Sequence, residues 1–74
     1  MSYNYDKLMG RIVEMYGTQF NFAKAIKVSE HSVSNKLNNK VGWKQQEIED
    51  CCEALRIQRS EIPEYFFTYY VQYA

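Results

Sequence analysis

The chain has 74 residues, which suffices for one domain. Its formal net charge is zero, with nine basic and nine acidic side chains, and this balance alone argues against a nucleic-acid partner. No apolar run reaches the roughly 18 residues of a membrane span. A basic stretch followed by an apolar one, as in a signal peptide, is also absent from the N-terminus, so we expect a cytoplasmic protein.

The residue types that carry catalysis or bind metals are sparse. Cys51 and Cys52 are adjacent, and the single histidine, His31, stands far from them, so the three lack metal-ligand spacing. We expect both cysteines to be buried or half-buried in a helix. Neither a Ser/His/Asp set nor a phosphate-cradling glycine loop is present. The sequence therefore predicts a protein that is not an enzyme, with no cofactor and no small-molecule substrate.

The first predicted helix runs from Tyr5 or Asp6 to Tyr16. Leu8 and Ile12 begin an apolar stripe at helical spacing. Gly17 is placed to end this helix in the left-handed conformation.

Two short helices follow, over residues 19–26 and 30–37. Thr18 and Ser29 are their expected N-caps, since a hydroxyl can accept from a free amide of the first turn. Only a tight turn fits between them, and Val28 is its expected apolar plug.

Apolar residues give this pair of helices an inward face. We expect Phe22, Ala23 and Ile26 to face the core from the first of the two, with Phe20 flanking them. Val33 and Leu37 are spaced by four residues and should anchor the second.

A fourth helix is predicted over residues 44–55, after Trp43, which we expect to anchor a loop or the core. Ile48, Cys51, Cys52 and Leu55 form its apolar stripe. Its outer face is expected to carry Glu47, Glu49, Asp50 and Glu53.

The C-terminal segment is rich in aromatic residues. Ser60 and Pro63 favour a last short helical turn, after which residues 65–74 have strong strand propensity. Tyr65 and Phe66 are expected to close the core under the first helix. Two alternatives remain for the rest: pairing across a dimer axis, or packing of the terminus on its own domain. In the first case the dimer interface would comprise Phe67, Tyr69, Val71 and Tyr73.

Charge is distributed unevenly along the chain. Residues 18–45 hold five lysines against Glu30, a balance of +4, and residues 46–74 have a balance of −4. The positive stretch coincides with the pair of short helices. This end of the molecule is suited to meet phosphates, with the acidic end pointing away.

The segment from Thr18 to Asn39 fits a helix-turn-helix in several places at once, and it resembles the phage Cro and lambda-repressor-like family. The similarity extends to YDKL, LNNKVGWKQ and EIPEYFF, which are similar to small single-domain Cro-like regulators of phages and prophages of Gram-positive bacteria. Lys27 departs from the pattern, because the family usually has glycine there. The residues that carry the match are Gln19, Ala23, Val28, Ser29, Val33 and Leu37.

This resemblance implies a mainly α, compact domain of four to five helices. It also implies a homodimeric, non-enzymatic repressor that binds double-stranded operator DNA, with the second helix of the pair in the major groove. The base-contacting positions it implies are Glu30, His31, Ser32, Asn35 and Lys36. The expected contacts to the DNA backbone are Thr18, Gln19, Asn38, Asn39, Lys40 and Lys44.

Three alternatives remain open at this stage. Glu30 can accept from a cytosine amino group or simply interact with the helix dipole. The polar face of residues 30–37 can be an ordinary solvated surface. The whole chain can instead be a protein-interaction module on the same fold, an antitoxin or antirepressor whose aromatic tail holds a partner.

Overall fold

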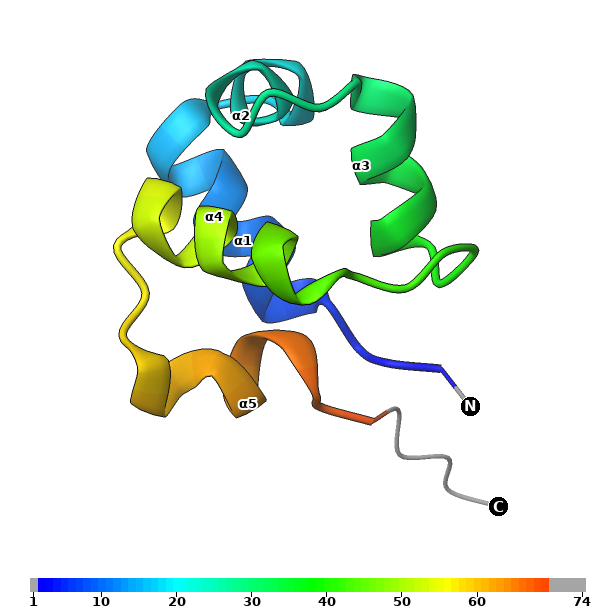
Figure 1. Cartoon of the computed structure of the whole chain (residues 1–74), viewed down its shortest axis with the longest axis vertical. Coiled ribbons are helices and arrows are strands. Elements are labelled where there is room, and N and C mark those ends of the chain that lie inside the picture. Colours follow the sequence, from blue (N-terminus) through cyan, green and yellow to red (C-terminus); the bar gives the residue numbers. More distant parts are fainter. Residues whose placement is uncertain (1, 70–74) are drawn as a thin grey trace.

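The computed structural model describes residues 2–69 as a mainly α domain (Figure 1). Its elements are α1 (Asp6–Tyr16), α2 (Gln19–Ala25), α3 (Glu30–Leu37), α4 (Gln45–Leu55), the 3₁₀ turn η1 (Arg59–Glu61) and α5 (Ile62–Phe66). Figure 1 shows α1 at the centre behind α4, with α2 above, α3 to one side and α5 below. The predicted fold class and the order of the helices are confirmed.

Local capping sets the helix boundaries. The Asn4 side chain accepts from the Asp6 amide at 2.8 Å, which satisfies one of the free donors at the start of α1. Gly17 ends α1 with φ +80°, in the left-handed region where glycine has no steric cost. Both predicted hydroxyl caps also form, at Thr18 for α2 and at Ser29 for α3.

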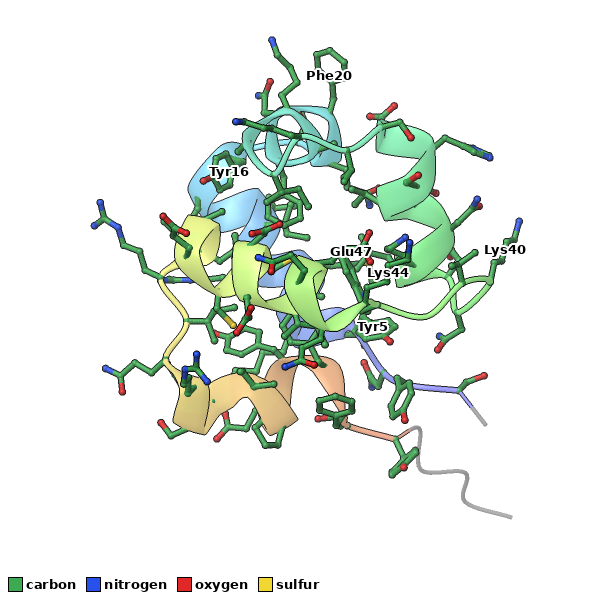
Figure 2. The ribbon with its side chains drawn as sticks, in the orientation of Figure 1. Tyr5, Tyr16, Phe20, Lys40, Lys44 and Glu47 are labelled. Atoms are coloured by element: carbon green, nitrogen blue, oxygen red, sulfur yellow. The ribbon has the colours of Figure 1, made fainter. Side chains whose placement is uncertain are left out.

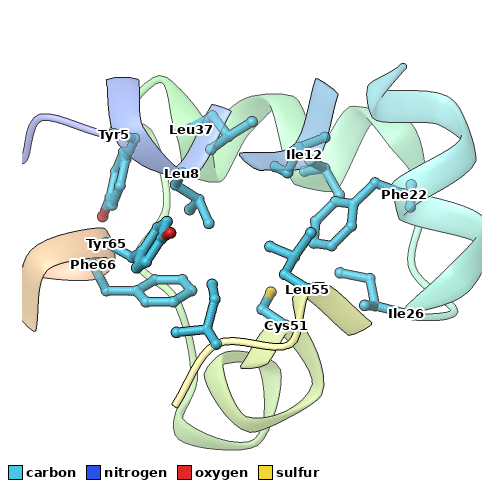
Figure 3. Packing of buried hydrophobic residues seen from close by; sticks show 13 residues of the cluster. Tyr5, Leu8, Ile12, Phe22, Ile26, Leu37, Cys51, Leu55, Tyr65 and Phe66 are labelled. Atoms are coloured by element: carbon cyan, nitrogen blue, oxygen red, sulfur yellow. The ribbon is translucent and has the colours of Figure 1, made fainter. Parts of the chain in front are cut away.

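One hydrophobic core joins the helices (Figure 3). Leu8 and Ile12 of α1 are fully buried, and they meet Phe22 from α2 and Leu55 from α4 in the same cluster. Every predicted anchor of the short helices is buried: Phe22, Ala23, Ile26, Val33 and Leu37. Because a chain of this size has little interior, each of these buried side chains matters for the stability of the domain.

The first two residues of the aromatic C-terminal segment are helical and do not form a strand. Tyr65 and Phe66 are buried as predicted, but they lie in the short helix α5, which contacts α1. Trp43 packs edge-on against Tyr5 and Phe66, with centroid distances of 6.5 and 5.6 Å, as expected for a core-anchoring residue. Tertiary packing of the two aromatic rings therefore outweighs their strand propensity.

Candidate interaction surface of α2 and α3

The turn between α2 and α3 is held by backbone geometry that a side chain normally disfavours. Lys27 adopts φ +61°, so the turn forms with a lysine at the position where the helix-turn-helix pattern usually has glycine. The Val28 amide then donates to the Ala23 carbonyl at 3.0 Å. Ala23 is 1% exposed, which explains why only a small side chain fits there.

The outer side of α3 presents short polar side chains. Glu30 and His31 are exposed, and Ser32 and Asn35 are half-buried. The Asn35 amide lies 3.3 Å from His31 Nε2, one turn away, so these two groups orient each other. Four of the five predicted base-contacting residues thus retain some exposure.

Lys36 does not lie where the sequence analysis placed it. Its side chain is only 8% exposed, and its Nζ lies 3.4 Å from Glu47 Oε2 in α4. The expectation of an exposed Lys36 is therefore wrong. The sequence contains a pattern that predicts this burial. Lys36 follows Val33 by three residues and precedes Leu37, so it lies on the inward stripe of the helix. A lysine stem can pack there while its ammonium finds a carboxylate.

Glu47 is the second correction, because the sequence analysis placed it on the outer face of α4. Its side chain is 18% exposed, and its Oε1 accepts from the Lys44 amide at 2.8 Å. This bond satisfies a free donor at the start of α4, while the other carboxylate oxygen meets Lys36. Figure 2 shows Glu47 and Lys44 together beside α3.

Phe20 is exposed rather than packed beside the inward face of α2. It is 52% exposed and projects from α2 (Figure 2), and Lys24 Nζ lies 5.4 Å from its ring centroid. A cation over an aromatic face is weakly attractive. The α2–α3 surface, meaning the exposed side of these two helices, thus carries a large apolar side chain that periodicity did not single out.

The residues predicted to contact a DNA backbone are mostly accessible. Gln19 is half-buried, and the others are exposed: Thr18, Asn38, Asn39, Lys40 and Lys44. Two of the asparagines, however, already have protein partners. The Asn38 amide donates to the Ser34 carbonyl at 2.8 Å, and Asn39 is bound to the N-terminal segment.

Asn39 makes two hydrogen bonds to the backbone of Tyr3. Its Oδ1 accepts from the Tyr3 amide at 2.8 Å, and its Nδ2 donates to the Tyr3 carbonyl at 3.0 Å. Asn39 itself has φ +62°, a conformation that asparagine tolerates better than most residues. The end of α3 is thereby tied to a residue 36 positions earlier.

The described part of the aromatic tail packs on its own domain. Tyr69 forms an antiparallel bridge with Tyr3, and their rings stack at 5.0 Å between centroids. Phe67 meets Tyr3 edge-on at 5.8 Å. Of the predicted dimer-interface residues, Val71 and Tyr73 lie outside the described residues, and Phe67 and Tyr69 are about half exposed.

Within residues 2–69, no group of three or more His, Cys, Asp or Glu side chains is arranged to hold a metal ion. None of the described helices is long and apolar enough to cross a membrane. Cys51 is buried and Cys52 is half-buried, as predicted, and both thiols are free. Burial raises the pKa of Cys51, and the neighbouring thiol of Cys52 adds to this effect.

Comparison with known proteins relates this arrangement to phage regulation. Residues 1–69 match the family described as "Protein of unknown function (DUF739)". The curated proteins gave no match. The solution structure of the modulator of repression (MOR) of the temperate bacteriophage TP901-1 from Lactococcus lactis is 49% identical, covers 97% of each chain and superposes with a TM-score of 0.81. The chain therefore belongs to the DUF739 family and is a homologue of a small phage regulator.

Proposed function

We propose that this chain modulates repression in a phage genetic switch, and that it does so by binding a DNA-binding repressor protein through the α2–α3 surface. The observation that carries the proposal is the 49% identity, over 97% of each chain, to a protein described as a modulator of repression. Such an agent acts by binding, without catalysis, and in the host cytoplasm where repression takes place.

The chemistry of the α2–α3 surface favours a protein over DNA as its target. Phe20 on α2 is 52% exposed. The phosphate backbone of DNA would offer this ring no apolar partner. Aromatic residues are enriched in protein interfaces, where such a side chain can fill a pocket of the partner. Lys24 beside it can pair with a carboxylate at the rim of the same contact.

The burial of Lys36 also argues against DNA as the target, because it leaves fewer lysines free to contact phosphates. Affinity for a duplex rises with the number of phosphates that lysine and arginine neutralise. With Lys36 paired to Glu47, the exposed lysines of residues 18–45 are Lys24, Lys27, Lys40 and Lys44. Glu30, exposed at the start of α3, opposes them.

Sequence-specific binding of operator DNA, as by a Cro-like repressor, is the second candidate. The paired His31 and Asn35 side chains favour it, because an asparagine can bond an adenine edge through donor and acceptor together. One α3 reads few base pairs, so this candidate also requires a homodimer, with two copies of α3 about 34 Å apart on the duplex.

A binding assay separates the two candidates. The purified chain is titrated into labelled operator duplex alone, and into the same duplex carrying the repressor of its own phage. Under the first proposal, the chain alone does not retard the duplex, and its addition changes the repressor–operator complex. If the chain alone retards the duplex, with an affinity that falls log-linearly and steeply with salt, direct DNA binding is the correct function.

Two variants test whether the α2–α3 surface causes the change in the repressor–operator complex. Phe20→Ala on α2 should abolish the change in the repressor–operator complex, whereas Phe67→Ala, an equally exposed phenylalanine after α5, should leave it intact. Loss of the effect in Phe67→Ala alone would refute the α2–α3 surface as the site and favour the aromatic tail.

A further inference from the structure

A second surface lies along α4, on the side that faces η1 and α5. It surrounds a cavity of about 630 Å³ that we call the α4–α5 groove. In the described part of the chain, its lining comes from α4, its preceding loop and the segment from η1 to Phe67, and not from α2 or α3. The apolar floor consists of Trp43, Ile48, Cys52, Ile62 and Phe67.

The rim of this groove is acidic. Glu49, Asp50 and Glu53 line it, with Arg59 as the one basic group among the lining residues. Arg59 lies 3.5 Å from Glu49, but its side chain is 88% exposed, and so exposed a pair holds its members weakly. The groove therefore keeps a net negative charge next to an apolar floor.

The apolar surface continues beyond the groove. Trp43, Ile48 and Phe67 also line a neighbouring cavity of about 340 Å³, whose other walls include Tyr3 and Val41. Val41 and Phe67 are each 48% exposed and Tyr69 is 50% exposed. Exposed apolar residues that gather in one place mark an interaction site more often than scattered ones do.

One polar atom in this surface lacks a partner. The indole Nε1 of Trp43 is buried, and no described group accepts its hydrogen. An unpaired buried donor is costly, so the packing around Trp43 is less well satisfied than the rest of the core. The Trp43 side chain lines both cavities and so joins their apolar surfaces.

From this combination we propose that the α4–α5 groove docks a basic amphipathic helix of a partner protein. Apolar side chains on one stripe of that helix cover Ile48, Phe67 and the Trp43 ring. Lysine or arginine residues beside the stripe face Glu49, Asp50 and Glu53. Apolar anchors at helical spacing supply the affinity, and the opposite charges select a basic helix over an acidic one.

A second copy of this chain is a less suitable occupant. The described helices leave two large hydrophobic side chains exposed, Val13 on α1 and Phe20 on α2, and these do not form the apolar stripe that the groove would cover. A contact of either side chain with the groove of another copy would be head-to-tail and would propagate into open chains unless it closed a ring.

The test uses the full chain and a synthetic helical peptide that lacks tryptophan. The peptide carries leucine at positions i, i+3, i+4 and i+7 and lysine at the remaining positions, and a matched peptide carries glutamate instead of lysine. Trp43 is the only tryptophan of the chain and lies in the groove, so its fluorescence reports binding directly. We expect the lysine peptide to bind at least about tenfold more tightly than the glutamate peptide.

Matched variants locate the contact. Glu49→Gln with Glu53→Gln should weaken binding by about fivefold, since each exposed charge pair contributes little. Glu14→Gln with Glu30→Gln removes the same charge elsewhere and should leave binding unchanged. Phe67→Ala should weaken binding of the peptide, and Phe20→Ala should not.

Three results would overturn the proposal. The first is no change in fluorescence or in amide chemical shifts of α4 and α5 with the lysine peptide. The second is equal weakening in the groove pair and the control pair of variants. The third is concentration-dependent self-association of the chain alone that Phe20→Ala abolishes, which would identify a second copy as the occupant.

Discussion

Lys36 in α3 and Glu47 in the first turn of α4 form an ion pair, with Nζ 3.4 Å from Oε2 and both side chains largely buried. Glu47 also accepts from the Lys44 amide, so a single carboxylate caps α4 and fixes α3 against it. Removing two charges from water costs free energy, and the attraction between them offsets this cost. If one partner is lost, the other remains as a buried, unpaired charge that destabilises the fold. The orientation of α3 relative to the body thus depends on a contact between two helices.

Glu47→Gln tests this contact. An amide oxygen can still accept from Lys44, so the substitution mainly removes the charge opposite Lys36. We expect the free energy of unfolding to fall by about 2 kcal/mol, because a buried ammonium is left unpaired. Urea unfolding measures this, with Glu53→Gln as the exposed control. The double variant Lys36→Met with Glu47→Gln should recover part of the loss, and additive losses would argue against a coupled pair.

Asn39→Gly separates the two roles of Asn39. Glycine tolerates φ +62° but cannot bond to the backbone of Tyr3. We expect a loss of about 1 kcal/mol and faster exchange of the Tyr3 amide, measured by thermal unfolding and by NMR. Asn39→Ala should lose about 1 kcal/mol more, since alanine disfavours the left-handed region. An unchanged exchange rate of the Tyr3 amide in Asn39→Gly would contradict the role of this contact.

Lys27→Gly should stabilise the protein. Lys27 holds φ +61° in the turn between α2 and α3, where glycine avoids the clash of Cβ with the backbone. The expected gain is about 0.5–1 kcal/mol, because the greater entropy of glycine in the unfolded chain offsets part of the relief. The midpoint of urea unfolding measures it. Lys24→Gly, inside α2, serves as the opposite control and should destabilise the domain.

Alkaline pH should destabilise the fold through Cys51. Burial raises the pKa of this thiol above its ordinary value of 9.0, so the unfolded chain loses the proton first as the pH rises. Stability is thus fully present below pH 9.0 and falls above it. Burial also raises the pKa of Tyr5 above 10.0, which steepens the fall beyond that pH.

The comparison of wild type with Cys51→Ala checks this assignment. The variant should be less stable near neutral pH, because the side chain that it truncates is fully buried. Its free energy of unfolding should depend less on pH between 9 and 10 than that of the wild type. Parallel pH profiles of the two proteins, measured by urea unfolding, would show that Cys51 is not the responsible group.

Phe20→Ala should separate stability from function. Its ring is 52% exposed, so the free energy of unfolding should change by less than about 0.5 kcal/mol. Binding to the repressor should weaken by about tenfold or more if the ring anchors that contact. Urea unfolding measures the stability, and isothermal titration against the repressor, with Phe67→Ala as the control, measures the affinity. Comparable affinities for Phe20→Ala and wild type would remove Phe20 from the interface.

Local chemistry allowed much of the fold to be predicted from the sequence. The N-caps Thr18 and Ser29, the terminator Gly17 and the apolar spacing of Val33 and Leu37 each act within a few residues. Such signals can be identified in the sequence, and the observed helix ends lie within one residue of the predicted ones for the first four helices. The departure at Lys27 was identified from the resemblance to the helix-turn-helix family, and Lys27 adopts φ +61° in this turn.

The candidate site was less predictable, because exposure depends on what the other helices cover. The sequence pattern placed Lys36 and Glu47 on the surface. In the structure α3 packs against the start of α4, and this contact buries both side chains. Phe20 looked like a flanking core residue, but the described helices leave it open.

The sequence by itself determined four helices, a tight turn and the uneven distribution of charge, because caps, glycine and helical spacing are local. Only the tertiary structure decided that Asn39 binds Tyr3, that Tyr69 pairs with the N-terminal segment and that the +4 stretch contains a neutralised lysine. Those outcomes join residues 11 to 66 positions apart, and a pattern with a period of a few residues carries no information on such pairs.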